Sequence, residues 1–138
     1  MSKASFIKQA DRYCARFQQQ FNDLIAQFGD LSLGDPTATY ADPHLMRRWV
    51  RFLELDLRYL RAELDHIRAL PQPDEDRETL QRFLGSLESA IGEGKIAQSA
   101  ARHGDQSALS SHIDAGLSDF DREGSAAQAY GFQECGQF

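Results

Sequence analysis

The sequence predicts an all-α protein that folds as an antiparallel, up-down-up-down bundle of four helices. Apolar residues recur in four segments at the three- and four-residue spacing of one helix face. Proline or glycine separates the segments, and no stretch alternates in the manner of a β-strand. With 138 residues, the chain has the usual size of one domain, so we assign residues 1–138 to a single helical-bundle domain.

The first helix is expected over residues 3–28, and Gly29 ends it. Its apolar face consists of Phe6, Ile7, Ala10, Tyr13, Cys14, Phe17, Phe21, Leu24, Ile25 and Phe28. The second helix is expected to begin at Asp42, a helix-capping residue, followed by Pro43 at the first helical position. Pro71 stops it, because proline cannot continue a helix. Its apolar face consists of Met46, Trp49, Leu53, Leu57, Leu60, Leu64 and Ile67.

The third helix is expected to open at Asp74, where a group of acids suits a positive helix N-terminus, and to end near Gly104. Its buried face consists of Leu80, Phe83, Leu84, Leu87, Ile91, Gly94 and Ala97. The fourth helix is expected to start at Asp105 or Ser107 and to end at Gly131. Its core face consists of Leu109, Ile113, Leu117, Phe120, Ala127 and Tyr130. Short second and third connections make neighbouring helices antiparallel.

The charge balance argues against nucleic acid as a partner. The net charge is −6, whereas phosphate binding is driven by Lys and Arg. Half of the twelve arginines lie between Arg47 and Arg68, where acids interleave with them: Glu54, Asp56, Glu63 and Asp65. We interpret this segment as a solvated, salt-bridged helix face.

Four apolar residues of the second helix extend its apolar face beyond a narrow stripe: Trp49, Phe52, Leu55 and Tyr59. Two interpretations are open. The connection over residues 31–42, with its apolar Leu31, Leu33 and Tyr40, folds over them, or they form an exposed patch that binds a protein partner or a second copy of the chain.

No apolar run approaches the roughly 18 residues of a transmembrane helix, so no membrane span is expected. The first nine residues have no hydrophobic region of a signal peptide, which indicates a cytoplasmic chain. A chain that had lost a leader would have the same sequence.

The two cysteines lie far apart in the sequence, Cys14 in the first helix and Cys135 almost at the C-terminus. An up-down-up-down bundle places the end of its fourth helix beside the start of its first. On the residues alone, a disulfide bridge and a pair of reduced thiols are both open.

Three segments are similar to those of a known group of proteins: residues 3–11 followed by Cys14, the Leu-Pro-x-Pro break at residues 70–73, and the closing residues 130–136. They resemble a largely uncharacterised group of small bacterial helical domains, mostly secreted or membrane-anchored. The resemblance covers nearly the whole chain. It implies a helical bundle, a Cys14–Cys135 disulfide and, if a leader was removed, an extracytoplasmic location. It implies no activity.

Metal chemistry has one weak signal. Glu63 and His66 have the Glu-x-x-His spacing of bundle-core di-iron sites, but such sites need a second copy, which the sequence does not contain. We therefore expect a solvated pair. The other histidines, His44, His103 and His112, are scattered, and neither zinc-ligand spacing nor a haem-attachment motif is present.

Enzyme signatures are also absent from the sequence. It contains no nucleophile elbow, no phosphate-binding glycine loop and no dinucleotide fingerprint. We therefore expect no enzyme, no catalytic residue and no cofactor. The function expected is a non-catalytic helical interaction or ligand-binding module, and the alternative is a metal- or haem-binding four-helix bundle, which rests on fold analogy.

Overall fold

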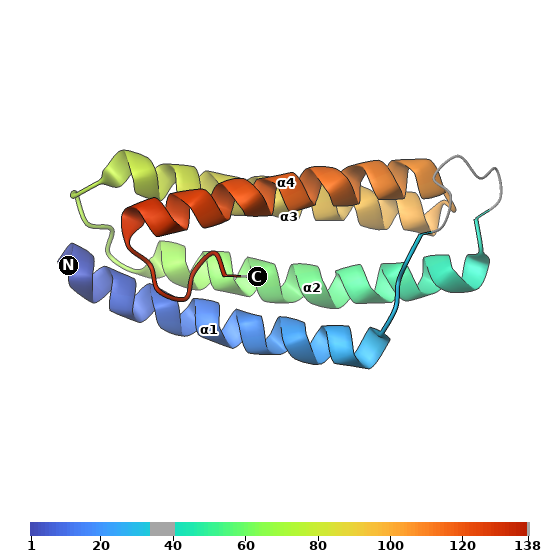
Figure 1. Ribbon diagram of the computed structural model, residues 1–138, viewed down its shortest axis with the longest axis horizontal. Coiled ribbons are helices and arrows are strands. Elements are labelled where there is room, and N and C mark those ends of the chain that lie inside the picture. Colours follow the sequence, from blue (N-terminus) through green and yellow to red (C-terminus); the bar gives the residue numbers. More distant parts are fainter. Residues whose placement is uncertain (34–40, 138) are drawn as a thin grey trace.

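The computed structural model describes residues 1–33 and 41–137 and contains four long helices (Figure 1). They are α1 (Lys3–Phe28), α2 (Pro43–Ala69), α3 (Arg77–Arg102) and α4 (Gln106–Tyr130). Consecutive helices run in opposite directions, and the described residues form no strand. The predicted antiparallel four-helix bundle is confirmed.

Acidic caps fix two of the helix starts, as the sequence predicts. The Asp42 carboxylate accepts a hydrogen bond from the backbone N–H of His44 at 2.9 Å, and Pro43 occupies the first helical position. The Asp105 carboxylate accepts one from the backbone N–H of Ala108 at 3.0 Å. These bonds satisfy backbone donors that a helix leaves free in its first turn.

The third helix begins later than the sequence predicts, at Arg77 instead of Asp74. Asp76 has a φ of 54°, in the left-handed region, and its side chain makes no capping hydrogen bond. Its carboxylate instead accepts from Lys3 Nζ at 2.5 Å, which ties the start of α3 to the start of α1. The acids around residue 74 therefore form a turn that precedes the helix.

Apolar side chains fill the bundle in two clusters along its length. One lies at the end where α1 begins and α4 ends, and its most deeply buried members include Phe6, Ile67, Leu80, Phe83, Leu87 and Tyr130. The other lies at the opposite end and includes Leu24, Met46, Trp49, Phe52, Ala97 and Leu109. The interior is therefore apolar in two parts, and the partly buried Phe21 and Tyr59 pack against both of them.

The first and last helices are the least closely packed neighbours. α3 packs closely on α4, α2 on α3 and α1 on α2, but α1 and α4 do not pack closely on each other. The segment after α4, residues 131–137, runs back between α1 and α4 near the end that holds the N-terminus (Figure 1). We call this segment the tail. It fills only part of the gap between the two helices.

Candidate functional site

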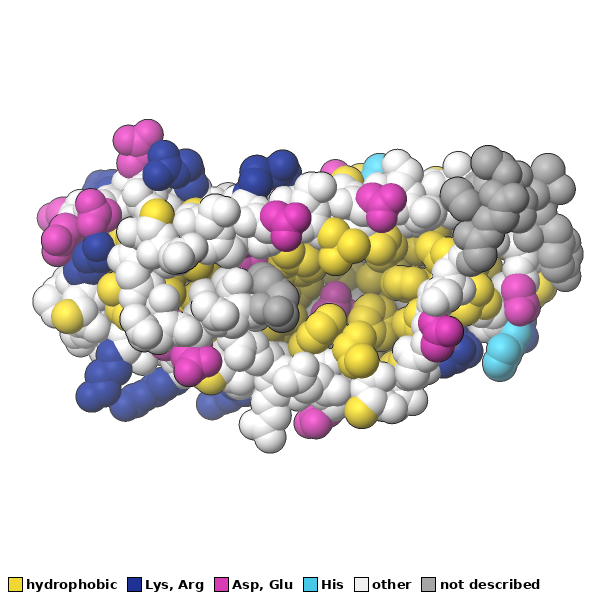
Figure 2. Space-filling view, in the orientation of Figure 1, with side chains coloured by type: hydrophobic (Ala, Val, Ile, Leu, Met, Phe, Trp, Pro, Cys, Tyr) yellow, Lys and Arg dark blue, Asp and Glu magenta, His cyan; other side chains and the backbone are white. Residues whose placement is uncertain are grey.

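The rest of the gap between α1 and α4 is hollow. Figure 2 shows this face of the molecule, where hydrophobic side chains line a depression and an acidic side chain lies inside it. The cavity has a volume of about 280 Å³. We call it the cleft, and its lining comes from all four helices: Phe21, Trp49, Phe52, Leu53, Asp56, Leu57, Leu60, Ala90, Gly94, His112, Ile113, Gly116, Leu117 and Phe120.

The α4 side of the cleft corrects one expectation from the sequence. Ile113, Leu117 and Phe120 were expected in the core, yet Leu117 is 56% exposed and the other two are only partly buried. The reason is geometric, because α1 does not approach α4 closely enough to cover them. The apolar stripe of α4 therefore faces a cavity along this stretch.

Aromatic rings from α1 and α2 form the opposite wall. Phe52 meets the rings of Phe21, Phe28 and Trp49 edge-on, with centroids 5.6 to 6.5 Å apart. The indole Nε1 of Trp49 donates to the Leu31 carbonyl at 3.0 Å, which fixes the orientation of its ring. Ring contacts and a hydrogen bond within the chain therefore hold this wall in place.

The proposed patch of Trp49, Phe52, Leu55 and Tyr59 is not an exposed surface. The first three are buried, with 7 to 8% of each residue exposed, and Tyr59 is half-buried. Part of their cover comes from the connection after α1: Leu31, Leu33 and Ala41 pack on the same cluster. Tyr40, the other residue expected to cover them, lies outside the described residues.

One carboxyl group lies among the apolar side chains of the cleft. Asp56 is 8% exposed, and its Oδ1 has no hydrogen-bond partner among the described residues. None of the lysines and arginines over residues 1–33 and 41–137 lines the cleft. Burial raises the pKa of Asp56 to about 7, because removal from water disfavours the charged form. A buried polar atom without a partner is costly, and in native proteins it is rare.

Two further carboxyl groups are buried deeper in the bundle. Glu63 is 5% exposed and Glu123 is 1% exposed, and Oε2 of Glu123 lacks a hydrogen-bond partner among the described residues. Burial raises the pKa of Glu63 well above its usual value, and the nearby charges of Glu123 and Asp56 raise it further. Burial likewise raises the pKa of Glu123 to about 8. These groups hold their protons more tightly than exposed acids do.

The expectation of a solvated acidic face on the second helix is therefore wrong for Asp56 and Glu63. Each follows a buried leucine by three residues, Leu53 and Leu60 respectively, and so lies on the apolar face of α2. Glu54, by contrast, is exposed as expected. Sequence reasoning could have identified the two buried acids by their position within the apolar stripe.

The histidines form no metal site among the described residues, which contain no group of three residues suited to hold a metal ion. His66 does not pair with Glu63. It is exposed, and its ring stacks on that of Tyr13 with centroids 4.6 Å apart. His112 borders the cleft, and its Nδ1 lies 2.6 Å from Oε2 of Glu93 on α3. His44 and His103 are exposed at helix ends.

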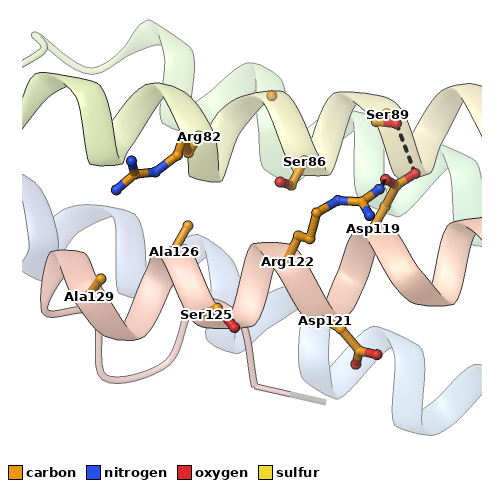
Figure 3. Close-up of a pocket in the computed structure, with 10 residues that line it drawn as sticks. Arg82, Ser86, Ser89, Asp119, Asp121, Arg122, Ser125, Ala126 and Ala129 are labelled. Carbon is orange, nitrogen blue, oxygen red and sulfur yellow. Dashed lines mark hydrogen bonds and ion pairs between the residues drawn. The ribbon is translucent and has the colours of Figure 1, made fainter.

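A second hollow, of about 670 Å³, lies between α3 and α4 (Figure 3). Its one buried charge, Asp119, is already paired: it accepts from Ser89 Oγ at 2.8 Å and forms an ion pair with Arg122. Arg82 and Arg122 extend into solvent, since more than half of each side chain is exposed. Because its buried charge already has partners, this groove is a weaker candidate than the cleft.

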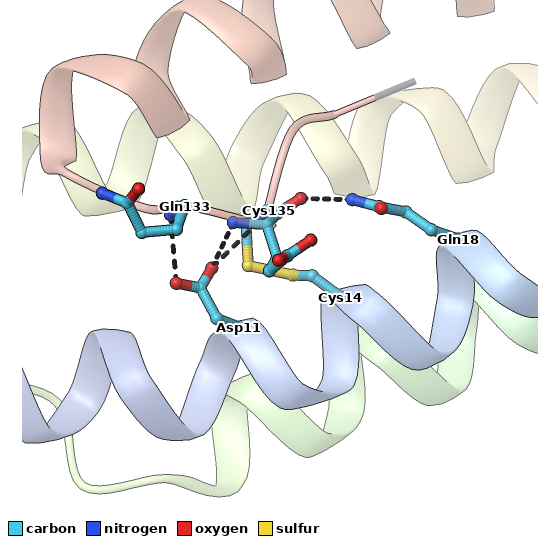
Figure 4. The surroundings of a disulfide bond; sticks show 6 residues. Asp11, Cys14, Gln18, Gln133 and Cys135 are labelled. Carbon is cyan, nitrogen blue, oxygen red and sulfur yellow. Dashed lines mark hydrogen bonds between the residues drawn. A yellow bond between two sulfur atoms is a disulfide. The ribbon is translucent and has the colours of Figure 1, made fainter.

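The tail is joined to α1 by a disulfide between Cys14 and Cys135, as Figure 4 shows. The predicted pairing of the two cysteines is confirmed. One turn before Cys14, the Asp11 carboxylate accepts three backbone N–H groups of the tail, those of Gln133, Glu134 and Cys135, each at 3.0 Å. The Asp11 carboxylate and the Cys14 disulfide lie on one face of α1, and together they hold the same segment of the tail.

The tail also packs closely against the end of α4. Gly131 ends that helix with a φ of 106°, in the left-handed region that glycine adopts without strain. Gly136 has a φ of 77°, and a Cβ there would lie 2.7 Å from Cβ of Ala127. These contacts give a structural role to the closing residues 130–136 that the sequence singled out.

Comparison of the chain with protein-family models, with curated proteins and with solved structures finds no match to any of the three. None of the described helices combines the length and apolar character that crossing a membrane requires.

Proposed function

We propose that this protein is a non-catalytic ligand-binding module whose site is the cleft between α1 and α4. The observation that supports it most is the combination of an apolar cavity with a buried carboxyl group, Asp56, whose Oδ1 has no hydrogen-bond partner in the described part of the chain. Binding sites for small molecules combine mostly apolar walls with a few polar groups that fix orientation.

The size of the cleft limits its occupant to a small molecule. Its volume of about 280 Å³ exceeds that of the roughly 150 Å³ cavity that takes up benzene, and it lies just below the ~300–1,000 Å³ of drug-sized sites. A ligand with one ring and a short chain fits this range. The exposed apolar surface of Leu117 favours binding of such a ligand, because binding removes that surface from water.

The single tryptophan of the chain provides the test, because Trp49 lines the cleft. Titration with small apolar alcohols, beginning with 2-phenylethanol, should give a saturable change in Trp49 emission excited at 295 nm. Gly116 lines the cleft, and a Cβ there meets only Cβ of Glu93 at 3.7 Å, an ordinary contact distance. Gly116→Leu should therefore reduce the volume of the cavity, and thermal unfolding checks that the variant is folded. We expect this variant to bind at least tenfold more weakly.

Gly85→Leu is the matched control. Gly85 is also a helical glycine, but it lines the groove between α3 and α4, and a Cβ there meets nothing within 4 Å. This variant should bind 2-phenylethanol as the unmodified protein does. The proposal fails if no apolar probe gives a saturable response, or if Gly116→Leu and Gly85→Leu bind equally well.

A further inference from the structure

Building on the proposed binding function, we propose that the cleft takes a small apolar amine, whose ammonium group pairs with the carboxylate of Asp56. Asp56 is more than nine-tenths buried, lines the cavity, and has an oxygen atom with no partner among the described residues. An ammonium group supplies both what this oxygen lacks, a hydrogen-bond donor, and a compensating positive charge.

The rest of the cleft lining cannot supply that charge. Among the residues that the structure describes, this lining contains neither lysine nor arginine, and its one other ionisable side chain, His112, already has Glu93 as its partner at 2.6 Å. A buried carboxylate is destabilising unless an opposite charge and hydrogen bonds compensate it. A cationic ligand that brings its own counter-charge therefore gains more from this site than a neutral ligand of the same shape.

The aromatic wall favours the same class of ligand. Phe21, Trp49 and Phe52 line the cleft on the sides of α1 and α2. Aromatic faces attract cations through their π-electrons, and the attraction strengthens when the site excludes water. A carboxylate beside aromatic rings thus combines two independent features that select an organic cation, while the apolar walls select its hydrocarbon part.

The ionisation of Asp56 makes the preference depend on pH. Glu63 on α2 interacts electrostatically with Asp56 and also with Glu123 on α4. His112 on α4 lines the cleft and pairs with Glu93 on α3, while α1 contributes the uncharged Phe21. Burial raises the pKa of Asp56 to about 7, so the charged form that binds an ammonium increases as the pH rises through neutrality. The preference for an amine should increase over the same range.

The test compares three probes with one hydrocarbon part: phenethylamine, 2-phenylethanol and 3-phenylpropionate. Trp49 fluorescence at pH 8.5 should show the amine binding at least tenfold more tightly than the alcohol, and the carboxylate binding most weakly. At pH 6 the preference for the amine should shrink to threefold or less. Binding of the alcohol alone supports the proposed function, and equal binding of amine and alcohol at pH 8.5 overturns the amine proposal without affecting it.

Asp56→Asn removes the charge and keeps the shape, so it should abolish the amine preference while alcohol affinity changes less than threefold. Glu54→Gln is the matched control, since it removes an exposed acid from the same helix. It should preserve the preference. Thermal unfolding shows that each variant is folded. An amine preference that survives Asp56→Asn, or disappears in Glu54→Gln, would overturn the assignment to Asp56, and no binding of any probe would overturn both proposals.

Discussion

Two stretches of the gap between α1 and α4 differ in what covers the interior of the bundle. In one stretch the tail lies over the core, and Phe132 packs against the ring of Phe83 with centroids 4.8 Å apart. In the other, the apolar face of α4 borders the cleft, and Leu117 is 56% exposed. The same two helices therefore form a closed stretch and an open stretch.

The two stretches also treat a buried aspartate in opposite ways. Asp11 and Asp56 are 9% and 8% exposed, so their burial is nearly the same. Asp11 accepts three backbone N–H groups from the tail, whereas Oδ1 of Asp56 has no partner among the described residues. The closed stretch is built for stability. The open stretch leaves apolar surface exposed beside this carboxyl oxygen, a combination that suits a binding site.

The largest effect is expected from opening the closed stretch at its disulfide. Cys14 and Cys135 are 121 residues apart, and in the chain-entropy model a bond across such a loop stabilises a protein by about 4 to 5 kcal/mol. Urea unfolding of the Cys14→Ala, Cys135→Ala double variant should show a loss of this size. Adding reductant should destabilise the unmodified protein and leave the variant unchanged. Equal stability of the two proteins without reductant would contradict the prediction.

The next effect concerns the open stretch and its buried acid. The pKa of Asp56 is about 7 in the folded protein against 3.8 in the unfolded chain, so the folded state binds more protons between these values. The contribution of Asp56 to the free energy of unfolding is therefore fully present below about pH 4 and is lost as the pH rises through 7. Asp56→Asn should be up to about 4 kcal/mol more stable than the unmodified protein at pH 8.5, and about equally stable at pH 4.

Unfolding in urea at a series of pH values between 4 and 8.5 measures this difference. The pKa of Glu123 is also raised, to about 8, so some pH dependence should remain in the Asp56→Asn variant. Glu54→Gln should follow the unmodified protein at every pH, because its side chain is exposed. Parallel pH profiles for Asp56→Asn and the unmodified protein would show that the carboxyl group is solvated.

A smaller effect is expected at the buried acid of the closed stretch. Asp11→Asn replaces one accepting oxygen with an amide that donates, so it opposes the N–H groups that Asp11 accepts. We expect a loss of about 2 to 3 kcal/mol in urea unfolding. Asp23→Asn, at an exposed position of the same helix, should change stability by less than about 0.5 kcal/mol.

Combining Asp11→Asn with the loss of the disulfide distinguishes a role of Asp11 in holding the tail from a role within α1. In the variant that lacks both cysteines, the tail is held less firmly, so Asp11→Asn should cost less there than in the oxidised protein. If the cost is the same in both backgrounds, the three hydrogen bonds to the tail do not explain it.

Much of the fold was predictable from local signals. The C-terminal ends of α1 and α4 follow from glycine at positions 29 and 131, and α2 starts directly after the predicted capping aspartate. The start of α3 was misplaced, because a group of acids predicts a favourable N-terminus without fixing which of them precedes the first helical residue. Local chemistry thus gives the existence of a helix more reliably than its first residue.

The cleft was not predictable in the same way. An apolar stripe on α4 indicates which face is apolar, but it does not show whether a neighbour covers that face. Leu117 follows the pattern of a core residue and is exposed because α1 lies too far away, a property of the assembled bundle. Asp56 did leave a signal, a charge three residues from one buried leucine and four from another, but the arginines around it favoured a solvated interpretation.

The smallest loss of stability is expected from shortening Leu117. A small loss there is what distinguishes an open stretch from a closed one. Leu109 and Leu117 lie two turns apart on α4, with 0% and 56% of the residue exposed. Leu109→Ala leaves a cavity in a packed core and should cost about 2 to 5 kcal/mol, whereas Leu117→Ala should cost less than about 1 kcal/mol. Urea unfolding of the two variants gives both values. If α1 closed onto α4 in solution, Leu117 would be buried and the two costs would converge. Similar costs would therefore mean that the bundle has two closed stretches and no cleft.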